Sequence, residues 1–161
     1  MQLQKIFVAV AVLALTSANA TAASVGLGTT KGGLTAQVTA TISKVVSSHA
    51  GGLQMRTQVH GGTQKYIPVV NAGELEFGVA NMMQYTMAKQ GTGLSAGKKY
   101  ANLQLVATMM VFRTGWLVPK NSGITKISQL RGKRIASGFK GAPLFHFLLS
   151  AGLANAGLSY A

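Results

Sequence analysis

SVGLGTTKGG, residues 24–33, joins a short apolar run to a loop of small and polar residues. The apolar half predicts a buried strand, and the loop leads into residues 33–48, where apolar side chains recur at helical spacing. These side chains are Leu34, Val38, Ile42, Val45 and Val46. A strand that passes through glycines into an amphipathic helix is typical of the βα unit of a parallel sheet.

The same order of strand, loop and helix repeats along the chain. Residues 53–59 alternate apolar and polar side chains, which predicts a half-buried strand, and Thr63 is expected to cap a helix through Asn71. A further strand is expected over residues 77–80 and a helix over residues 82–90. The order β-α-β-α-β-α predicts an α/β fold with a mainly parallel sheet flanked by helices.

A second unit is expected after a polar loop. Apolar runs at residues 103–110 and 116–118 predict two more strands, and residues 119–123 read as a hinge-like connection. Residues 134–137 predict a strand and residues 142–156 a helix. One strand and one helix cannot bury both faces of a sheet, so this unit is expected to be incomplete.

Composition indicates one basic, globular chain. Its 161 residues suffice for one ordinary domain, and 48% of them are hydrophobic. Fifteen Lys and Arg oppose two carboxylates, giving a net charge of +13. The basic residues are scattered, apart from Lys98-Lys99 and residues 131–134, so no nucleic-acid track is expected. An exported protein that binds an anionic polymer or membrane surface stays open as the alternative function.

The rarity of acidic residues and the lack of cysteine argue against catalysis. Glu74 and Glu76 are the only carboxylates, which leaves no paired-carboxylate site and no Asp for a triad. No Cys is present, so disulfides and thiolate metal sites are excluded. His49, His60 and His146 show no metal-ligand spacing and are interpreted as structural or surface residues. We therefore expect no enzyme, no metal and no cofactor.

The first residues have the pattern of a secretory signal peptide. A weakly basic start is followed by the apolar residues 6–15. This run is too short for a helix that spans a bilayer, which needs about twenty residues. Small residues then provide cleavage patterns that end at Ala20 and Ala22. We expect residues 1–22 to be removed and the mature protein to reside in the periplasm.

The loop after the first predicted strand has the composition of an anion site. Backbone N–H groups at the start of a helix, together with the helix dipole, favour negative charge. Gly32 and Gly33 allow close approach, Thr29 and Thr30 add hydroxyl donors, and Lys31 adds a positive charge. An ordinary tight turn is the alternative interpretation.

Two other loops occupy the same position between a strand and a helix, at residues 60–63 and 138–142. Together the three loops predict a cleft lined by backbone donors that holds a carboxylate without catalytic residues. Asn81, Gln84 and Tyr85 follow another strand and are candidates for side-chain hydrogen bonds, with core packing the alternative for Tyr85. Several large side chains are expected in the core, namely Met82, Met83, Met109, Met110 and Trp116.

The chain resembles the solute receptors of TRAP transporters, specifically the TAXI group (TRAP-associated extracytoplasmic immunogenic proteins). The likeness is carried by GLGTTKGG at 26–33, VVNAGELEFGVA at 69–80, GITKISQLRGKRI at 123–135 and residues 138–142. It implies a type II periplasmic binding protein that captures a small organic anion, such as a dicarboxylate or an acidic amino acid. The implied partners are the membrane permease subunits of a TRAP transporter, with no nucleic acid.

The resemblance also implies a set of ligand contacts and a division into lobes. Together with the first loop's hydroxyls, the expected ligand-binding residues are Thr29, Thr30, Lys31, Gly32, Gly33, Asn81, Met82, Gly138, Gly141 and Ala142. Residues 23–118 are expected to form lobe one, and residues 119–161 a hinge and the incomplete start of lobe two. Because such receptors are longer, the chain is expected to be truncated to the N-terminal half.

Overall fold

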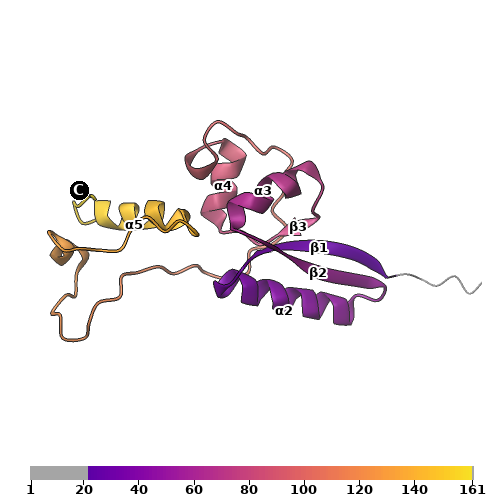
Figure 1. The fold of residues 1–161 in the computed structure, drawn as a ribbon, viewed down its shortest axis with the longest axis horizontal. Helices are drawn as coiled ribbons and strands as arrows, with labels where there is room; N and C mark the ends of the chain where they lie inside the picture. The colour runs from indigo at the N-terminus through magenta and orange to yellow at the C-terminus, as the bar shows by residue number, and fades with distance from the viewer. Residues whose placement is uncertain (1–21, 161) are drawn as a thin grey trace, which may run out of the picture.

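The computed structural model describes residues 22–160 and has a mixed α/β architecture (Figure 1). Its sheet has three parallel strands in the order β2-β1-β3. The elements are β1 Ala23–Thr30, α2 Gly33–His49, β2 Leu53–His60, α3 Thr63–Ala72, β3 Phe77–Gly78, α4 Met82–Gln90, η1 Gly93–Ser95, η2 Ile127–Leu130 and α5 Leu144–Ala154. The predicted fold class and the order of elements through residue 90 are confirmed.

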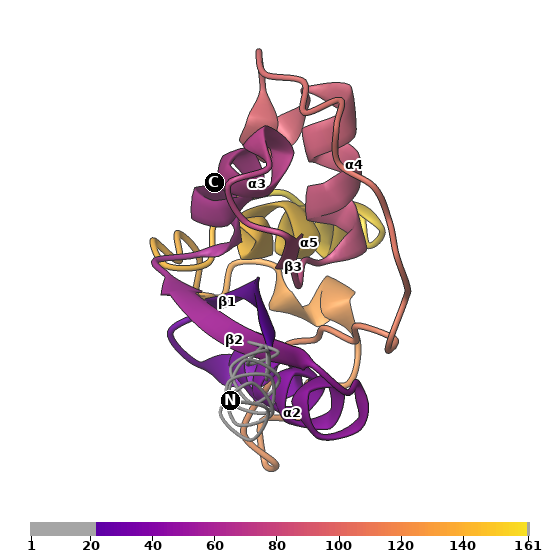
Figure 2. The same ribbon diagram turned by 90° about the vertical axis from the view of Figure 1, so that its right-hand side faces the viewer.

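Helices cover both faces of the sheet. Helix α2 packs along β1 and β2 on one face, while α3 packs on the other with α4 beside it (Figures 1 and 2). The core on the α3 side contains Ile67, Ala88 and Leu103, with Tyr85 packed against them. Core packing, the alternative interpretation of Tyr85, is therefore the one that the structure shows.

A glycine in the central strand β1 allows α3 to pack closely against the sheet. It pairs with β2 over its whole length, from Ala23 opposite Leu53 to Thr30 opposite His60. On the α3 face, a Cβ added to Gly28 would lie 3.0 Å from the ring of Tyr66. Tyr66 is 1% exposed, and the absence of a side chain at Gly28 allows this large ring to pack close against the sheet.

Helix α2 forms where predicted, but its most deeply buried side chains are polar and are not the apolar ones that the spacing indicated. Thr39 is 0% exposed and Ser43 is also buried, whereas Leu34 and Val45 are each 51% exposed. The Thr39 hydroxyl donates to the carbonyl of Thr35, so its polar atom is satisfied at the buried interface. Small hydroxyl side chains let the helix approach the sheet closely, a choice that apolar spacing does not reveal.

The predicted strands after residue 102 are wrong. Residues 103–118 and 134–137 have no regular secondary structure. A strand needs a neighbour for its backbone groups, and within residues 22–160 no chain segment pairs with either stretch. The last helix is shorter than predicted, since α5 begins at Leu144, after Pro143.

Other expectations also need correction. Met82, Met109 and Met110 are 46%, 51% and 52% exposed, so they are not core residues. Trp116 is only half-buried, and its ring lies against Gly152. Gly62, not Thr63, is the N-cap of α3.

Two further expectations concern export and the crossing of a membrane. The predicted signal peptide lies outside the described residues, apart from Ala22. Among the described helices, none combines the length and the apolar character needed to cross a bilayer.

The carboxylate of Glu76 closes part of the sheet edge. Strand β3 pairs with β1 only at Leu27 and Gly28, so the earlier part of β1 has no neighbouring strand on that side among the residues that the structure describes. There the Gly26 N–H donates to Glu76 Oε2 at 2.7 Å. This hydrogen bond favours the ionised carboxylate and lowers the pKa of Glu76 below its ordinary value of 4.5.

The close packing of Tyr66 on Gly28 predicts the effect of adding one methyl group. Gly28→Ala places a Cβ 2.9 Å from Leu75 Cδ2 and 3.0 Å from the Tyr66 ring, so it should lower the free energy of unfolding by about 1–3 kcal/mol. Gly51→Ala is the matched control, because no heavy atom lies within 4 Å of its added Cβ. Urea denaturation measures both; equal stabilities would contradict this packing.

The Glu76 hydrogen bond predicts a pH dependence. Because its pKa is lower in the folded state, its stabilisation is complete above the unfolded value and is lost as the pH falls through the folded value. Glu76→Gln should therefore flatten the decline in stability on the acid side of about pH 4.5. Urea midpoints across this range test it. Glu74→Gln is the control, since the Glu74 side chain makes no hydrogen bond within residues 22–160; an identical effect of both variants would contradict the assignment.

Candidate functional site

The carboxyl ends of β1 and β2 bring two of the predicted glycine loops together. Thr30 and His60 are register partners at the last position of each strand. The loops that follow, residues 31–32 and 61–62, therefore leave the sheet side by side and lead into α2 and α3. Ligands in parallel α/β sheets bind at this edge, where loops follow the strands.

Neither of these two helices has a side-chain cap. The N-caps are Gly32 for α2 and Gly62 for α3, and neither first turn contains an acidic residue. The first N–H groups of a helix have no partner within the helix and carry partial positive charge. Two such ends at one edge of a sheet form an environment that favours an anion.

Helix α4 differs, because its N-terminus is already satisfied. Asn81 is the N-cap, and its Oδ1 accepts from the Met83 N–H at 2.9 Å. The acceptor atom of Asn81 therefore serves the helix itself. Met82, the first residue of α4, has a largely exposed side chain.

The first loop is shaped by its own residues. The Thr30 hydroxyl donates to the carbonyl of Gly32 at 2.9 Å, which folds the loop back on itself. Gly33 has a φ of +74°, a left-handed conformation that favours glycine. Lys31 is exposed at the tip between them.

Three buried polar atoms near this edge lack a hydrogen-bond partner within residues 22–160: Thr29 Oγ1, His60 Nε2 and Gln64 Nε2. The His60 ring lies 5.4 Å from the Tyr66 ring, on the α3 face. Thr29, next to Gly28 in the strand, faces α2 instead, and it is 3% exposed. Buried polar groups are normally paired, so these atoms mark where a polar ligand or water would be accommodated.

Gln64 and the role of His60 were missed by sequence reasoning. His60 is the last residue of β2 and Gln64 lies in the first turn of α3, and these positions at a strand end and a helix start are the signal that would have found them. The expectation that Gln84 hydrogen-bonds at the site has no support, since its side chain is buried without a side-chain hydrogen bond among the described residues.

Tyr66 is a buried residue whose hydroxyl contacts the chain near the candidate site. Its hydroxyl donates to the carbonyl of Val79, just after β3, and lies 3.3 Å from Thr63 Oγ1. Burial raises the pKa of Tyr66, so it remains a neutral donor. The start of α3 and the end of β3 are thereby held in fixed relation.

The third glycine loop also reaches this region. A Cβ built on Gly62 would lie 3.7 Å from the carbonyl oxygen of Gly141. The loop that contains Gly138, Gly141 and Ala142 therefore lies against the second loop, although more than seventy residues separate them. The structure thus brings the second and third predicted loops into contact.

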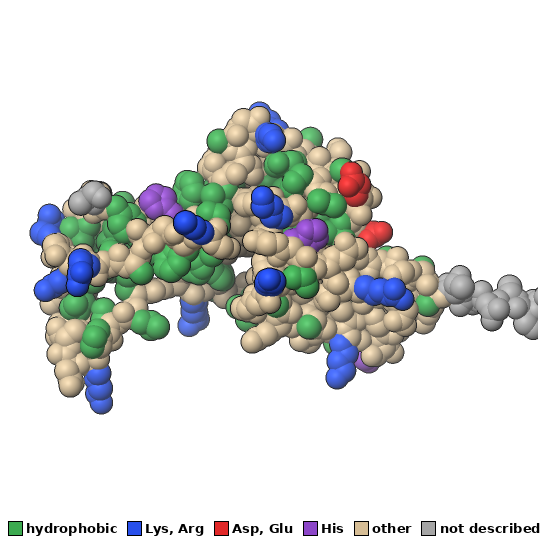
Figure 3. All heavy atoms as spheres, in the orientation of Figure 1, with side chains coloured by type: hydrophobic (Ala, Val, Ile, Leu, Met, Phe, Trp, Pro, Cys, Tyr) green, Lys and Arg blue, Asp and Glu red, His purple; other side chains and the backbone are tan. Residues whose placement is uncertain are grey.

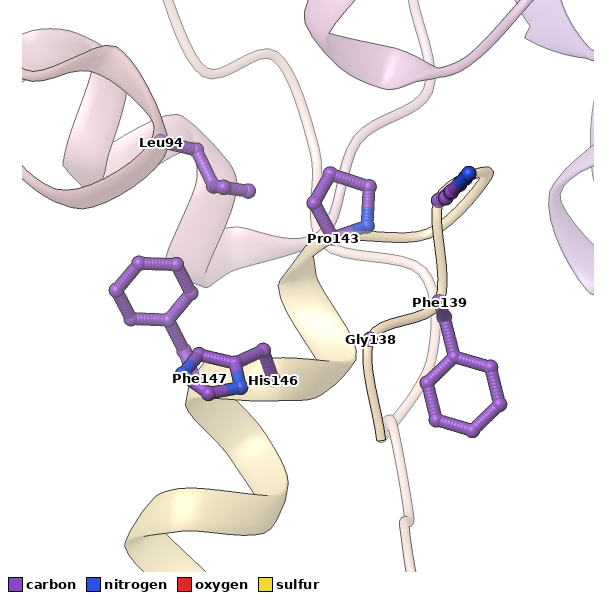
Figure 4. A pocket seen from close by; sticks show the side chains of 7 residues that line it. Leu94, Gly138, Phe139, Pro143, His146 and Phe147 are labelled. Atoms are coloured by element: carbon purple, nitrogen blue, oxygen red, sulfur yellow. The ribbon is translucent and has the colours of Figure 1, made fainter. Parts of the chain in front are cut away.

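A shallow pocket of about 330 Å³ lies beside the third loop (Figure 4). Its lining residues are Leu94, Gly138, Phe139, Lys140, Pro143, His146 and Phe147. Figure 4 shows Leu94 of η1 near Pro143 and Phe147 at the start of α5. The lining is mainly apolar, with Lys140 and His146 as its ionisable side chains.

The parallel three-stranded sheet flanked by helices is consistent with a lobe of a periplasmic binding protein. A protein-family model for the NMT1-like family matches residues 27–144. The chain belongs to this family, which is of the periplasmic-binding-protein type and indicates an extracytoplasmic solute-binding role. No curated protein and no solved structure matches it. The narrower resemblance to the TAXI group stays a prediction.

Asn81 provides a test of how the α4 terminus is built. Asn81→Ala removes the acceptor for the Met83 N–H and should lower the free energy of unfolding by about 1 kcal/mol, the usual effect of losing an N-cap. Asn81→Asp keeps the acceptor and should retain the stability. Chemical denaturation of the two variants checks this; equal loss in both would show that the cap does not stabilise the helix.

Proposed function

We propose that the protein is an extracytoplasmic receptor of a TRAP-type transporter, of the TAXI group, that captures a small organic anion for a membrane permease. The ligand class is a carboxylate such as a dicarboxylate or an acidic amino acid. The observation that carries this proposal is the pair of helix termini without side-chain caps at one edge of the sheet, next to buried polar atoms that have no hydrogen-bond partner among residues 22–160. The family membership agrees with it.

In this proposal the carboxylate accepts hydrogen bonds from the first-turn N–H groups of α2 and α3. Gln64 Nε2 belongs to an amide NH₂ and is a donor, so a carboxylate oxygen would satisfy it. His60 Nε2 would donate in the tautomer or charge state that carries a proton there. Lys31 adds positive charge at the loop tip, with Thr29, Thr30, Gly32 and Gly33 forming the rest of this wall.

The third loop would close the other side. Gly138, Gly141 and Ala142 belong in this proposal to the start of lobe two, residues 119–161, with Asn81 and Met82 at the border of lobe one, residues 23–118. The approach of Gly141 to Gly62 supports this arrangement. Closure of two lobes around a ligand is the usual way in which such folds bind solutes tightly.

Ligand binding should raise the stability of the full chain. A carboxylate that binds only the folded state at one hundred times its Kd adds about 2.7 kcal/mol to the free energy of unfolding. Melting temperatures with succinate, glutamate and their uncharged amides measure this. Gln64→Leu should reduce the response several-fold, while Lys44→Gln, an exposed change on α2 away from the edge, should keep it.

A salt control and two outcomes decide against the proposal. Sodium chloride at matched ionic strength is the control for nonspecific anion effects. If the carboxylates stabilise the chain no more than chloride does, or if Gln64→Leu responds as the unaltered chain does, the anion site is not at this edge.

A further inference from the structure

Residues 105–118 form an extended, apolar connection between the α/β unit and the C-terminal elements (Figure 1). Val106, Val111 and Leu117 are 78%, 80% and 102% exposed. Other large apolar side chains of this segment are also exposed, namely Leu105, Met109, Met110, Phe112 and Val118. Exposed apolar surface of this extent marks an interaction site. We refer to residues 105–118 as the apolar segment.

The charged residues close to the apolar segment in the sequence are all Lys or Arg. From residue 77 to residue 160 the sequence contains no carboxylate side chain. The basic residues there are Lys89, Lys98, Lys99, Arg113, Lys120, Lys126, Arg131, Lys133, Arg134 and Lys140. Figure 3 shows Lys and Arg interspersed with apolar side chains at the end of the molecule that contains η2 and α5, while both Glu side chains lie at the opposite side.

We propose that the apolar segment and its basic surroundings dock on an anionic lipid bilayer. Apolar side chains enter the boundary between headgroups and acyl chains, and Lys and Arg bind the anionic headgroups. Shallow insertion keeps the unpaired backbone at the hydrated headgroup level, where its polar groups retain partners. This surface is separate from the anion site at the sheet edge and does not depend on its function.

The observations favour a bilayer over other partners. A soluble polyanion would contact the basic side chains but leave the apolar segment in water. A second copy of the chain would bring two surfaces of the same charge together. Met109–Phe112 are consecutive and all exposed, so their side chains leave the extended backbone on both sides. A fluid interface can accommodate side chains on both sides of the segment.

Trp116 makes the test specific to this segment. It is the single Trp of the chain, it belongs to the apolar segment, and its side chain is half-buried with the ring against Gly152. Its fluorescence is followed while vesicles are added, either of phosphatidylcholine alone or of phosphatidylcholine with phosphatidylglycerol, with and without a spin-labelled lipid as quencher. We expect a blue shift and quenching with the anionic vesicles, and a loss of both at high salt.

Matched variants separate apolar insertion from charge. Val111→Gln with Leu117→Gln should weaken partitioning to anionic vesicles by about tenfold or more, since each buried CH₂ contributes to anchoring. The control pair is Leu34→Gln with Val45→Gln, two exposed apolar residues of α2, which should bind as the unaltered chain does. All variants share residues 1–22, so a difference between them cannot arise there. Both altered residues in the test pair are highly exposed, so folding should be retained.

Three results would overturn the proposal. The first is Trp116 fluorescence that is insensitive to lipid in every vesicle, the second is a Val111 and Leu117 double variant that binds as strongly as its control, and the third is equally strong binding to zwitterionic vesicles. Each result excludes docking of this surface on an anionic bilayer. If heparin binds with the same affinity as anionic vesicles and the double variant leaves both unchanged, the surface binds polyanions by charge alone.

Discussion

The close packing of Tyr66 against Gly28 of β1 is the constraint on which the rest of the molecule depends. At Gly26 and Gly28 the α3 face of β1 carries no side chain, and Leu75 and the ring of Tyr66 fill that space. The Tyr66 hydroxyl then holds the chain just after β3, so one residue joins the sheet, α3 and the approach to α4. Close packing of this kind tolerates little added volume.

The candidate site follows from this geometry, and its binding groups come mainly from the backbone. Parallel pairing of β1 with β2 places two helix starts side by side, and glycine N-caps leave their N–H groups available. A site made in this way recognises charge and shape before side-chain chemistry. Selectivity among anions would then come from the residues around it, such as Gln64 and His60.

The sequence predicted the fold best where structure is local. Helical spacing and strand alternation located every helix and strand through residue 90 to within about two residues, because these signals arise from neighbouring side chains. The strands expected at 103–110 and 134–137 failed because a strand is completed only by a partner strand. For the site, glycine loops were recognisable in the sequence. The capping role of Asn81, and the lack of a partner for His60 Nε2 and Gln64 Nε2 in the described part of the chain, appear only in three dimensions.

The Glu76 carboxylate has a consequence for self-association. An exposed sheet edge attracts strands from other molecules, and natural proteins protect such edges with charge. Glu76 Oε2 occupies the Gly26 N–H that an incoming strand would use, and it adds a negative charge at that point. In a chain with a strongly positive net charge, one acidic side chain thus makes pairing of a second molecule with this edge of the sheet, and hence aggregation, less favourable.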